Sequence, residues 1–180
     1  MKNLFIGIDF SKEKIDATVI SAIGLVEQSA RVSSEFKTTA CGYRQFLKWV
    51  EEHSNGIDMS SWLFCGENTG DYSKPLCNYL YGKGYDMWLE NAKCIKDASG
   101  LRRLKTDRAD FAMIAEYAMR NHDRALYYRP LSDSLSQLRE LFLYRHMIVR
   151  HKCSFQVRKE EKRMTMEKSP SRTLISNRPR

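Results

Sequence analysis

The sequence predicts an α/β fold in which a mixed five-stranded sheet is flanked by helices and followed by a long basic helix. Three observations support this prediction. Short apolar or alternating runs of strand length occur five times, helical-period segments separate the later runs, and no Gly or Pro interrupts residues 132–161. Because hydrophobic residues make up 42% of the 180-residue chain, it can bury a substantial core, and global disorder is excluded.

The first three strands are expected to form an antiparallel meander. Residues 4–9 form an almost continuous apolar run that ends in Asp9, which is typical of a buried strand. Residues 15–20 alternate and are rich in β-branched side chains, which favours a second strand. After a turn at Gly24, residues 26–33 alternate again and are predicted to form the third strand.

The rest of the chain changes between helical and strand patterns. Residues 62–67 form another apolar run that ends in a carboxylate, and residues 85–89 are the candidate for a fifth strand. The segment 91–103 is polar and basic and receives no assignment. Apolar residues at helical spacing predict helices over residues 39–53, 72–80, 108–121 and 132–161.

These patterns divide the chain into three expected parts. Residues 1–125 form the compact domain, and residues 126–164 form a basic helical or coiled-coil arm. Residues 165–180 contain two prolines and no apolar period, so we expect a disordered tail.

The composition also excludes several classes of protein. No run reaches the ~18 apolar residues that a membrane span needs, and the N-terminus reaches a charge too soon for a signal peptide. The five cysteines are scattered and never spaced as C-x-x-C, which argues against a disulfide framework and a structural zinc site. We therefore expect a cytoplasmic protein with no membrane partner.

The net charge of +8 is distributed unevenly. Residues 1–90 carry 9 Lys and Arg against 12 Asp and Glu, whereas residues 91–180 carry 21 against 10. A basic half indicates a polyanionic partner, most simply nucleic acid, although a solvated helical surface would give the same count.

Four acidic residues are candidates for a divalent-metal site. Asp9 and Glu67 end predicted buried strands, where an unpaired carboxylate is costly to desolvate. Asp107 and Asp110 are three residues apart at the start of a predicted helix, a spacing that places both on one helical face. Four converging carboxylates need cations, and hard oxygen ligands suit Mg²⁺ or Mn²⁺. Two such ions can polarise the attacking and leaving oxygens of a phosphodiester.

Each of these residues also has an ordinary structural explanation. Asp9 could be a turn former and Glu67 a loop residue, while Asp107 and Asp110 could simply complement the helix dipole. Taken one at a time, these explanations are the better ones. The ordered set of four favours the metal site.

The same residues resemble the DEDD transposases of the insertion-sequence-110 family, which are related to the Piv and MooV invertases. The resemblance is carried by IGIDFSKEKID at residues 6–16, GENTGDY at 66–72 and KTDRAD at 105–110, and it covers about residues 1–158. It implies a ribonuclease H-like domain similar to the resolvase RuvC, with Asp9, Glu67, Asp107 and Asp110 as the catalytic acids. Family members are recombinases that act on DNA, and some are guided by a structured RNA.

The resemblance also implies a second, C-terminal domain with a serine nucleophile, and this chain ends before such a domain. We therefore expect the N-terminal catalytic-type domain of an insertion-sequence transposase, unable to transpose alone. The alternative is a non-catalytic module that binds guide RNA or DNA and forms a homo-oligomer through its helical arm. A phosphotransferase similar to sugar or acetate kinases ranks last, because residues 66–70 are a poor version of a phosphate-binding turn.

Basic residues around and beyond the acidic set are the candidates for nucleic-acid binding. Contacts from such residues to phosphates would position a substrate at the metal ions. A solvated helix surface is again the ordinary alternative. The candidates are Lys93, Lys96, Arg102, Arg103, Lys105, Arg108, Arg139, Arg145 and Arg150.

Overall fold

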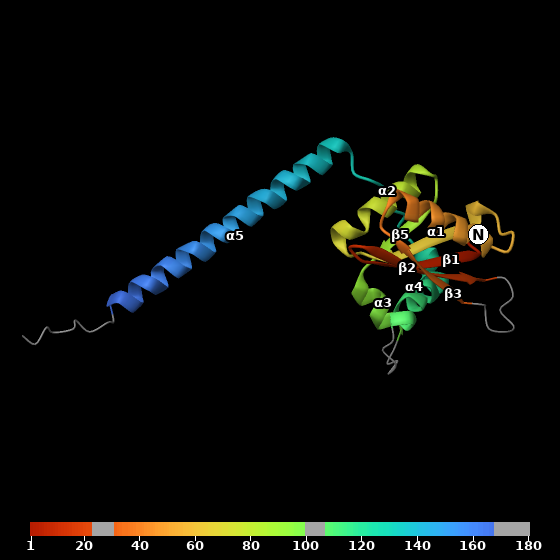
Figure 1. The fold of residues 1–180 in the computed structure, drawn as a ribbon, viewed down its shortest axis with the longest axis horizontal. Helices are drawn as coiled ribbons and strands as arrows, with labels where there is room; N and C mark the ends of the chain where they lie inside the picture. Colours follow the sequence, from red (N-terminus) through yellow and green to blue (C-terminus); the bar gives the residue numbers. More distant parts are fainter. Residues whose placement is uncertain (23–30, 100–106, 168–180) are drawn as a thin grey trace, which may run out of the picture. The chain divides into compact units, whose positions relative to one another are not determined.

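The computed structural model describes residues 1–22, 31–99 and 107–167, with the side chains of residues 99, 107–111, 166 and 167 left out. Two compact units make up the chain, Met1–Pro130 and Leu131–Arg180, and each is described by itself. The first unit contains the sheet and its covering helices. The second contains one long helix (Figure 1).

The first unit is built on a five-stranded sheet with the order β3-β2-β1-β4-β5. Neighbours β1, β2 and β3 are antiparallel, whereas β4 runs parallel to β1 and β5 runs parallel to β4. This mixed sheet is the arrangement expected for a ribonuclease H-like domain. Its strands are β1 Leu4–Phe10, β2 Lys14–Ser21, β3 Val32–Lys37, β4 Trp62–Glu67 and β5 Met87–Glu90.

Helices cover both faces of the sheet, and each face has its own apolar core. On one face, Phe46 of α1 and Leu80 of α2 pack with residues such as Ile8. On the other face, Ile95 of α3 and Ile114 of α4 join a second cluster. The helices are α1 Ala40–Glu52, α2 Lys74–Gly82, α3 Ala92–Ser99 and α4 Asp107–Asn121, with 3-10 turns at Met59–Ser61, Gly70–Tyr72 and His122–Arg124.

Most of the predicted elements of this unit are confirmed, but the third strand extends four residues past its expected end. It was expected over residues 26–33, whereas β3 runs from Val32 to Lys37, and residues 26–30 lie outside the described part. Phe36 explains the later position, because its ring packs 5.4 Å from the rings of Phe46 and Trp49. A strand that buries this ring against α1 cannot end at residue 33.

Helix α3 occupies the segment that the sequence analysis left unassigned. Ile95 is its single buried apolar residue, so the sequence shows no repeat of apolar residues at helical spacing from which a helix could be predicted. Asn91 starts the helix, since its side-chain oxygen accepts a hydrogen bond of 2.9 Å from the backbone N–H of Lys93.

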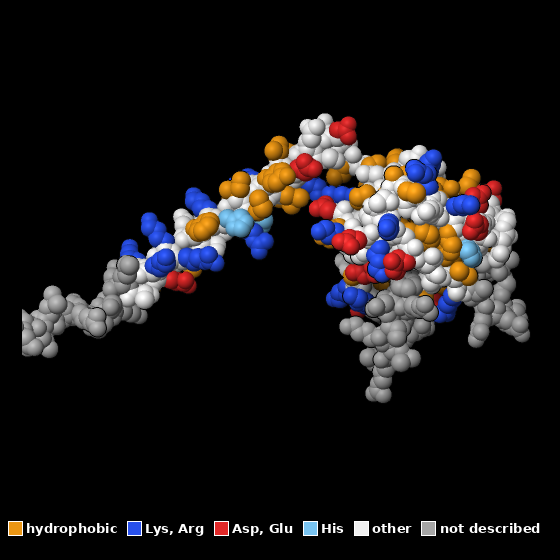
Figure 2. Space-filling view, in the orientation of Figure 1, with side chains coloured by type: hydrophobic (Ala, Val, Ile, Leu, Met, Phe, Trp, Pro, Cys, Tyr) orange, Lys and Arg blue, Asp and Glu red, His pale blue; other side chains and the backbone are white. Residues whose placement is uncertain are grey.

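The second unit contains α5, which runs from Asp133 to Glu167 and would extend about 52 Å at the usual helical rise. This helix continues three residues past residue 164, where the helical arm was expected to end. Apolar side chains gather on its first half and Lys and Arg on its second (Figure 2). Among the described residues, no helix is both long and apolar enough to cross a membrane.

Candidate functional site

Asp9 and Glu67 lie next to each other at the carboxyl ends of two parallel strands. The register of β1 and β4 pairs Ile8 with Gly66, and each acidic residue directly follows one member of this pair. Both are half-buried. The fold therefore brings together two of the four acidic residues singled out in the sequence.

These two residues belong to a longer row of carboxylates that crosses the whole sheet. Asp9 pairs with Asp16 of β2, Asp16 pairs with Glu35 of β3, and Glu67 pairs with Glu90 of β5. Every strand thus contributes one acidic residue at the same level. We call this set the acidic row, and its members in spatial order are Glu35, Asp16, Asp9, Glu67 and Glu90.

The acidic row lies on the face of the sheet that α3 and α4 cover. Side chains alternate along a strand, so residues an even number apart share a face. Phe5, Cys65 and Trp88 belong to the cluster on this face, and they share strands and parity with Asp9, Glu67 and Glu90. Ile15, Ala17 and Phe36 pack on the opposite side, which leaves Asp16 and Glu35 on the same face as the others.

At one end of the row, Lys14 balances two of the carboxylates. Its Nζ lies 2.6 Å from Oε2 of Glu35 and 3.4 Å from Oδ2 of Asp16. The hydrogen bond to Glu35 and the charge of Asp16 raise the pKa of the Lys14 ammonium, although burial opposes this effect.

At the other end, Glu90 is held by two hydrogen bonds. Its Oε1 accepts the backbone N–H of Asn91 at 2.6 Å, and its Oε2 accepts the hydroxyl of Tyr117 at 3.2 Å. Burial, and then the negative charge of Glu90, raise the pKa of Tyr117 to about 12. Tyr117 therefore remains a hydrogen-bond donor at any physiological pH.

Helix α4 runs antiparallel to β1. Its C-terminal end is followed by His122, whose ring lies 5.4 Å from that of Phe5 near the beginning of β1. Tyr117 reaches Glu90 at the end of β5. The N-terminal side of α4, where Asp107 and Asp110 stand, is consequently directed toward the carboxyl ends of the strands.

The structure leaves the complete four-carboxylate set untested, because the side chains of Asp107 and Asp110 lie outside the described residues. Within the described part of the chain, no three His, Cys, Asp or Glu side chains form a group that could hold a metal ion. Asp9 and Glu67 nevertheless fit such a group in chemistry and position, as adjacent, half-buried oxygen donors on one face.

Five of the nine basic candidates can be placed in full, and all five are exposed. They are Lys93 and Lys96 on α3 and Arg139, Arg145 and Arg150 on α5. Arg108 belongs to α4 but its side chain is outside the described set, as are Arg102, Arg103 and Lys105 altogether. Exposure makes phosphate contacts sterically feasible for the five.

The sequence analysis missed Asp16, Glu35, Glu90 and Tyr117. Asp16 looked like an ordinary polar position of an alternating strand, and Glu35 lay beyond the expected end of the third strand. Glu90 ends the fifth strand, as Asp9 and Glu67 end theirs, but that strand was expected to stop at residue 89. Only the register of the strands reveals that these acids are aligned.

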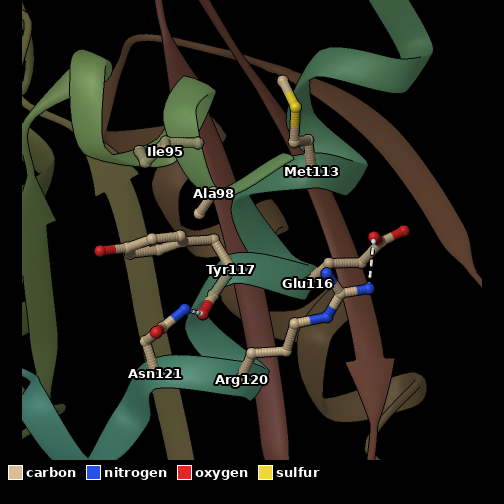
Figure 3. Close-up of a pocket in the computed structure, with 7 residues that line it drawn as sticks. All are labelled: Ile95, Ala98, Met113, Glu116, Tyr117, Arg120 and Asn121. Carbon is tan, nitrogen blue, oxygen red and sulfur yellow. Dashed lines mark hydrogen bonds and ion pairs between the residues drawn. The ribbon is translucent and has the colours of Figure 1, made fainter. Parts of the chain in front are cut away.

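A pocket between α3 and α4 lies on the same face (Figure 3). Its wall includes Glu116, whose side chain is only 8% exposed and lies 2.8 Å from Arg31 and 3.6 Å from Arg120. Asn121 donates a hydrogen bond of 2.9 Å to the carbonyl of Tyr117. These contacts neutralise a buried carboxylate and hold the helix; they do not by themselves indicate a ligand.

Solved structures and a family model are similar to this chain. A structure of Thermus thermophilus RuvC in complex with Holliday junction substrate aligns with a TM-score of 0.46 and 9% identity, covering 69% of this chain and 99% of that chain. A second Thermus thermophilus RuvC structure aligns with a TM-score of 0.43 and 12% identity over the same shares. No curated protein sequence matches. A family model described as "Transposase", that of the DEDD transposases of the IS110 group, matches residues 6–161. The chain belongs to this transposase family.

Proposed function

We propose that this chain supplies the catalytic-type domain of an insertion-sequence transposase, which acts on DNA phosphodiesters through a divalent-metal site. Asp9 and Glu67 would hold Mg²⁺ or Mn²⁺ together with Asp107 and Asp110. The bound ions would stabilise negative charge on the attacking and leaving oxygens of the phosphodiester. The residues of this chain position the ions and, through basic side chains, the DNA backbone.

The adjacency of Asp9 and Glu67 is the observation that carries this proposal. Adjacent strands of a sheet lie about 4.8 Å apart, so carboxylates at neighbouring positions are within reach of one shared cation. The direction of α4 adds support, since its first turn, with Asp107 and Asp110, is on the side of these strand ends. A cation there also offsets the repulsion that converging carboxylates would otherwise suffer.

A calorimetric titration with Mn²⁺ tests the metal site directly. We expect Asp9→Asn and Asp107→Asn to weaken binding by at least about tenfold relative to wild type. Asp123→Asn is the matched control, because Asp123 is an exposed aspartate on the 3-10 turn after α4. Equal affinity in wild type, Asp9→Asn and Asp107→Asn would contradict the proposal, as would cleavage of branched DNA that does not depend on Asp9.

DNA is the proposed substrate, and a structured guide RNA is proposed as a further partner. Lys93 and Lys96 are exposed on α3, which begins two residues after Glu90 of the acidic row. Replacing both with Ala should weaken binding of either nucleic acid and flatten its dependence on salt. Loss of RNA binding without loss of DNA binding, or the reverse, would show which polymer these residues contact.

A second candidate function is that of a non-catalytic binding and oligomerisation module, and α5 favours it. The first half of this helix exposes large apolar side chains that a partner helix would bury; among them Leu138, Leu141 and Ile148 are each more than 60% exposed. We propose self-association through this segment. Light scattering of wild type against Leu141→Asp, with Gln156→Asp on the polar half of α5 as control, measures it. A monomeric wild type would contradict the oligomer without affecting the metal site.

A further inference from the structure

Two hydrogen-bonded residues outside the four-acid set connect the sheet to the helix that carries Asp107 and Asp110. Glu90 ends β5 at the level of Glu67, and Tyr117 lies in the third turn of α4. The Tyr117 hydroxyl donates to Oε2 of Glu90 at 3.2 Å, although the two residues are 27 positions apart in sequence. The Tyr117 ring also packs 5.3 Å from that of Trp88.

We propose that Glu90 and Tyr117 form a positioning pair that sets the place of α4 over the acidic row, and thereby the place of Asp107 and Asp110 relative to Asp9 and Glu67. This inference rests on the proposed metal function. Neither member of the pair belongs to the acidic set that the family resemblance assigns. Their role is to hold the elements that bear that set.

The contacts of Glu90 favour a positioning role over metal ligation. Both carboxylate oxygens accept hydrogen bonds from the protein, Oε1 from the N–H of Asn91 and Oε2 from Tyr117. The bond from Asn91 fixes Glu90 at the point where α3 begins, because the Asn91 side chain caps that helix. Glu90 is thus an acceptor with a fixed position, and the hydrogen bond from Tyr117 to it holds α4 in place relative to β5.

A second contact holds α4 at the same level on its other side. Glu116, the residue before Tyr117, lies 2.8 Å from Arg31, which directly precedes β3. Consecutive residues of one helix therefore reach toward opposite edges of the sheet, β3 through Arg31 and β5 through Glu90. Contacts in both directions resist a sideways shift or a rotation of the helix.

The position of the pair along α4 makes it relevant to the metal site. Tyr117 is seven residues after Asp110 and ten after Asp107, about 10 Å and 15 Å along the helix axis. Ile114, one turn before Tyr117, is the first residue of α4 with a described and buried side chain. Tyr117 thus lies one turn after a residue of α4 that is buried against the sheet.

Four single variants separate positioning from other roles. Tyr117→Phe removes the hydroxyl and keeps the ring against Trp88. Glu90→Leu removes the acceptor, whereas Glu90→Gln keeps the contact, since a hydroxyl can accept from the amide as well as donate to it. Tyr81→Phe is the control, because Tyr81 is an exposed tyrosine on α2.

Hydrogen exchange of the backbone amides of residues 111–117, which follow the four N-terminal amides that lack an intrahelical acceptor, gives a readout that does not depend on metal. We expect exchange about tenfold faster in Tyr117→Phe and Glu90→Leu, which corresponds to loss of one hydrogen bond to a charged group. Glu90→Gln and Tyr81→Phe should exchange within about twofold of wild type. Unchanged exchange in Tyr117→Phe would overturn the pair, whatever the metal data show.

The Mn²⁺ titration of the same variants then tests the link to the site. Affinity should fall in Tyr117→Phe and Glu90→Leu and return in Glu90→Gln. A Glu90→Gln variant that loses affinity as strongly as Asp9→Asn would overturn the positioning role in favour of direct ligation. If wild type binds no Mn²⁺, the proposed metal function fails, and the exchange data alone decide whether the pair holds α4.

Discussion

Gly66 is the residue of β4 whose replacement should disturb both the core and the acidic row. It directly precedes Glu67, and the Phe10 ring, which follows Asp9 in β1, lies over it. A Cβ atom on Gly66 would overlap Cε2 of Phe10, lie 2.9 Å from its Cζ and lie 3.1 Å from the carbonyl oxygen of Ile8. Ordinary contacts begin about 3.4 Å apart, so the ring or the strand must move.

The expected cost of Gly66→Ala follows from this overlap. Phe10 is only 5% exposed and belongs to the core cluster under α1 and α2, so its ring has little space to turn into. Overpacking of this kind costs about 1–3 kcal/mol in the free energy of unfolding. Urea denaturation measures that change. Because the displaced ring adjoins Asp9, Mn²⁺ affinity should fall in the same variant.

A double-mutant cycle with Phe10→Leu tests whether this overlap is the cause. The smaller side chain removes the ring atoms that the new methyl would meet, so the two substitutions should be non-additive by about 1 kcal/mol or more. Additive effects, or a Gly66→Ala variant as stable as wild type, would refute the reasoning. Gly82→Ala is a control, because a Cβ atom there meets nothing within 4 Å.

Three further predictions concern buried or coupled groups. Glu116→Gln should lower the free energy of unfolding in urea by about 1–2 kcal/mol, because it removes the buried charge that pairs with Arg31 and Arg120. The loss is no larger because both arginines are about half exposed, and solvent screens the two ion pairs. In the native protein at pH 8, iodoacetamide should modify the exposed Cys41, Cys94 and Cys153 but not Cys65 or Cys77, and mass spectrometry counts the adducts. Burial raises the pKa of Cys65 and raises that of Cys77 to about 12, which leaves little thiolate in either. The pKa of Tyr117 is raised to about 12, so its contribution to stability is complete below about pH 10 and is lost as pH rises toward 12. The urea midpoint of Tyr117→Phe should therefore fall less between pH 10 and pH 12 than that of wild type.

The sequence was sufficient for the fold because its strands have strong local patterns. The apolar run before Asp9 and the one before Glu67 could each be read as a buried strand, and the two strands indeed lie side by side. The third strand was misplaced because Phe36 is a single, partly buried ring on an edge strand, which is a weaker signal than the alternating pattern at residues 26–33. Helix α3 was missed for a similar reason, since Ile95 is its only buried apolar residue.

The candidate site could be predicted only where an acid ends an apolar run. Asp16 lies inside an alternating segment, where a polar residue at every second position is expected, and Glu35 lies beyond the expected end of the third strand. Their relation to Asp9 is a matter of strand register, and register depends on pairings between distant segments. The Glu90–Tyr117 contact is longer in range still, and no local pattern encodes it.

The carboxylates of the acidic row repel one another, and contacts with neighbouring residues offset this repulsion at both ends. Like charges about 5 Å apart repel by about 1 kcal/mol in water and about 3 kcal/mol at an effective dielectric constant of 20. Lys14 offsets this repulsion at the Glu35 and Asp16 end, while Tyr117 and the Asn91 N–H stabilise Glu90 at the other. Asp9 and Glu67 form the middle of the row, at the strand ends toward which the N-terminal side of α4 is directed. A divalent cation held by Asp9 and Glu67 would reduce the repulsion along the row, because these two residues are adjacent and lie between the acids at its ends.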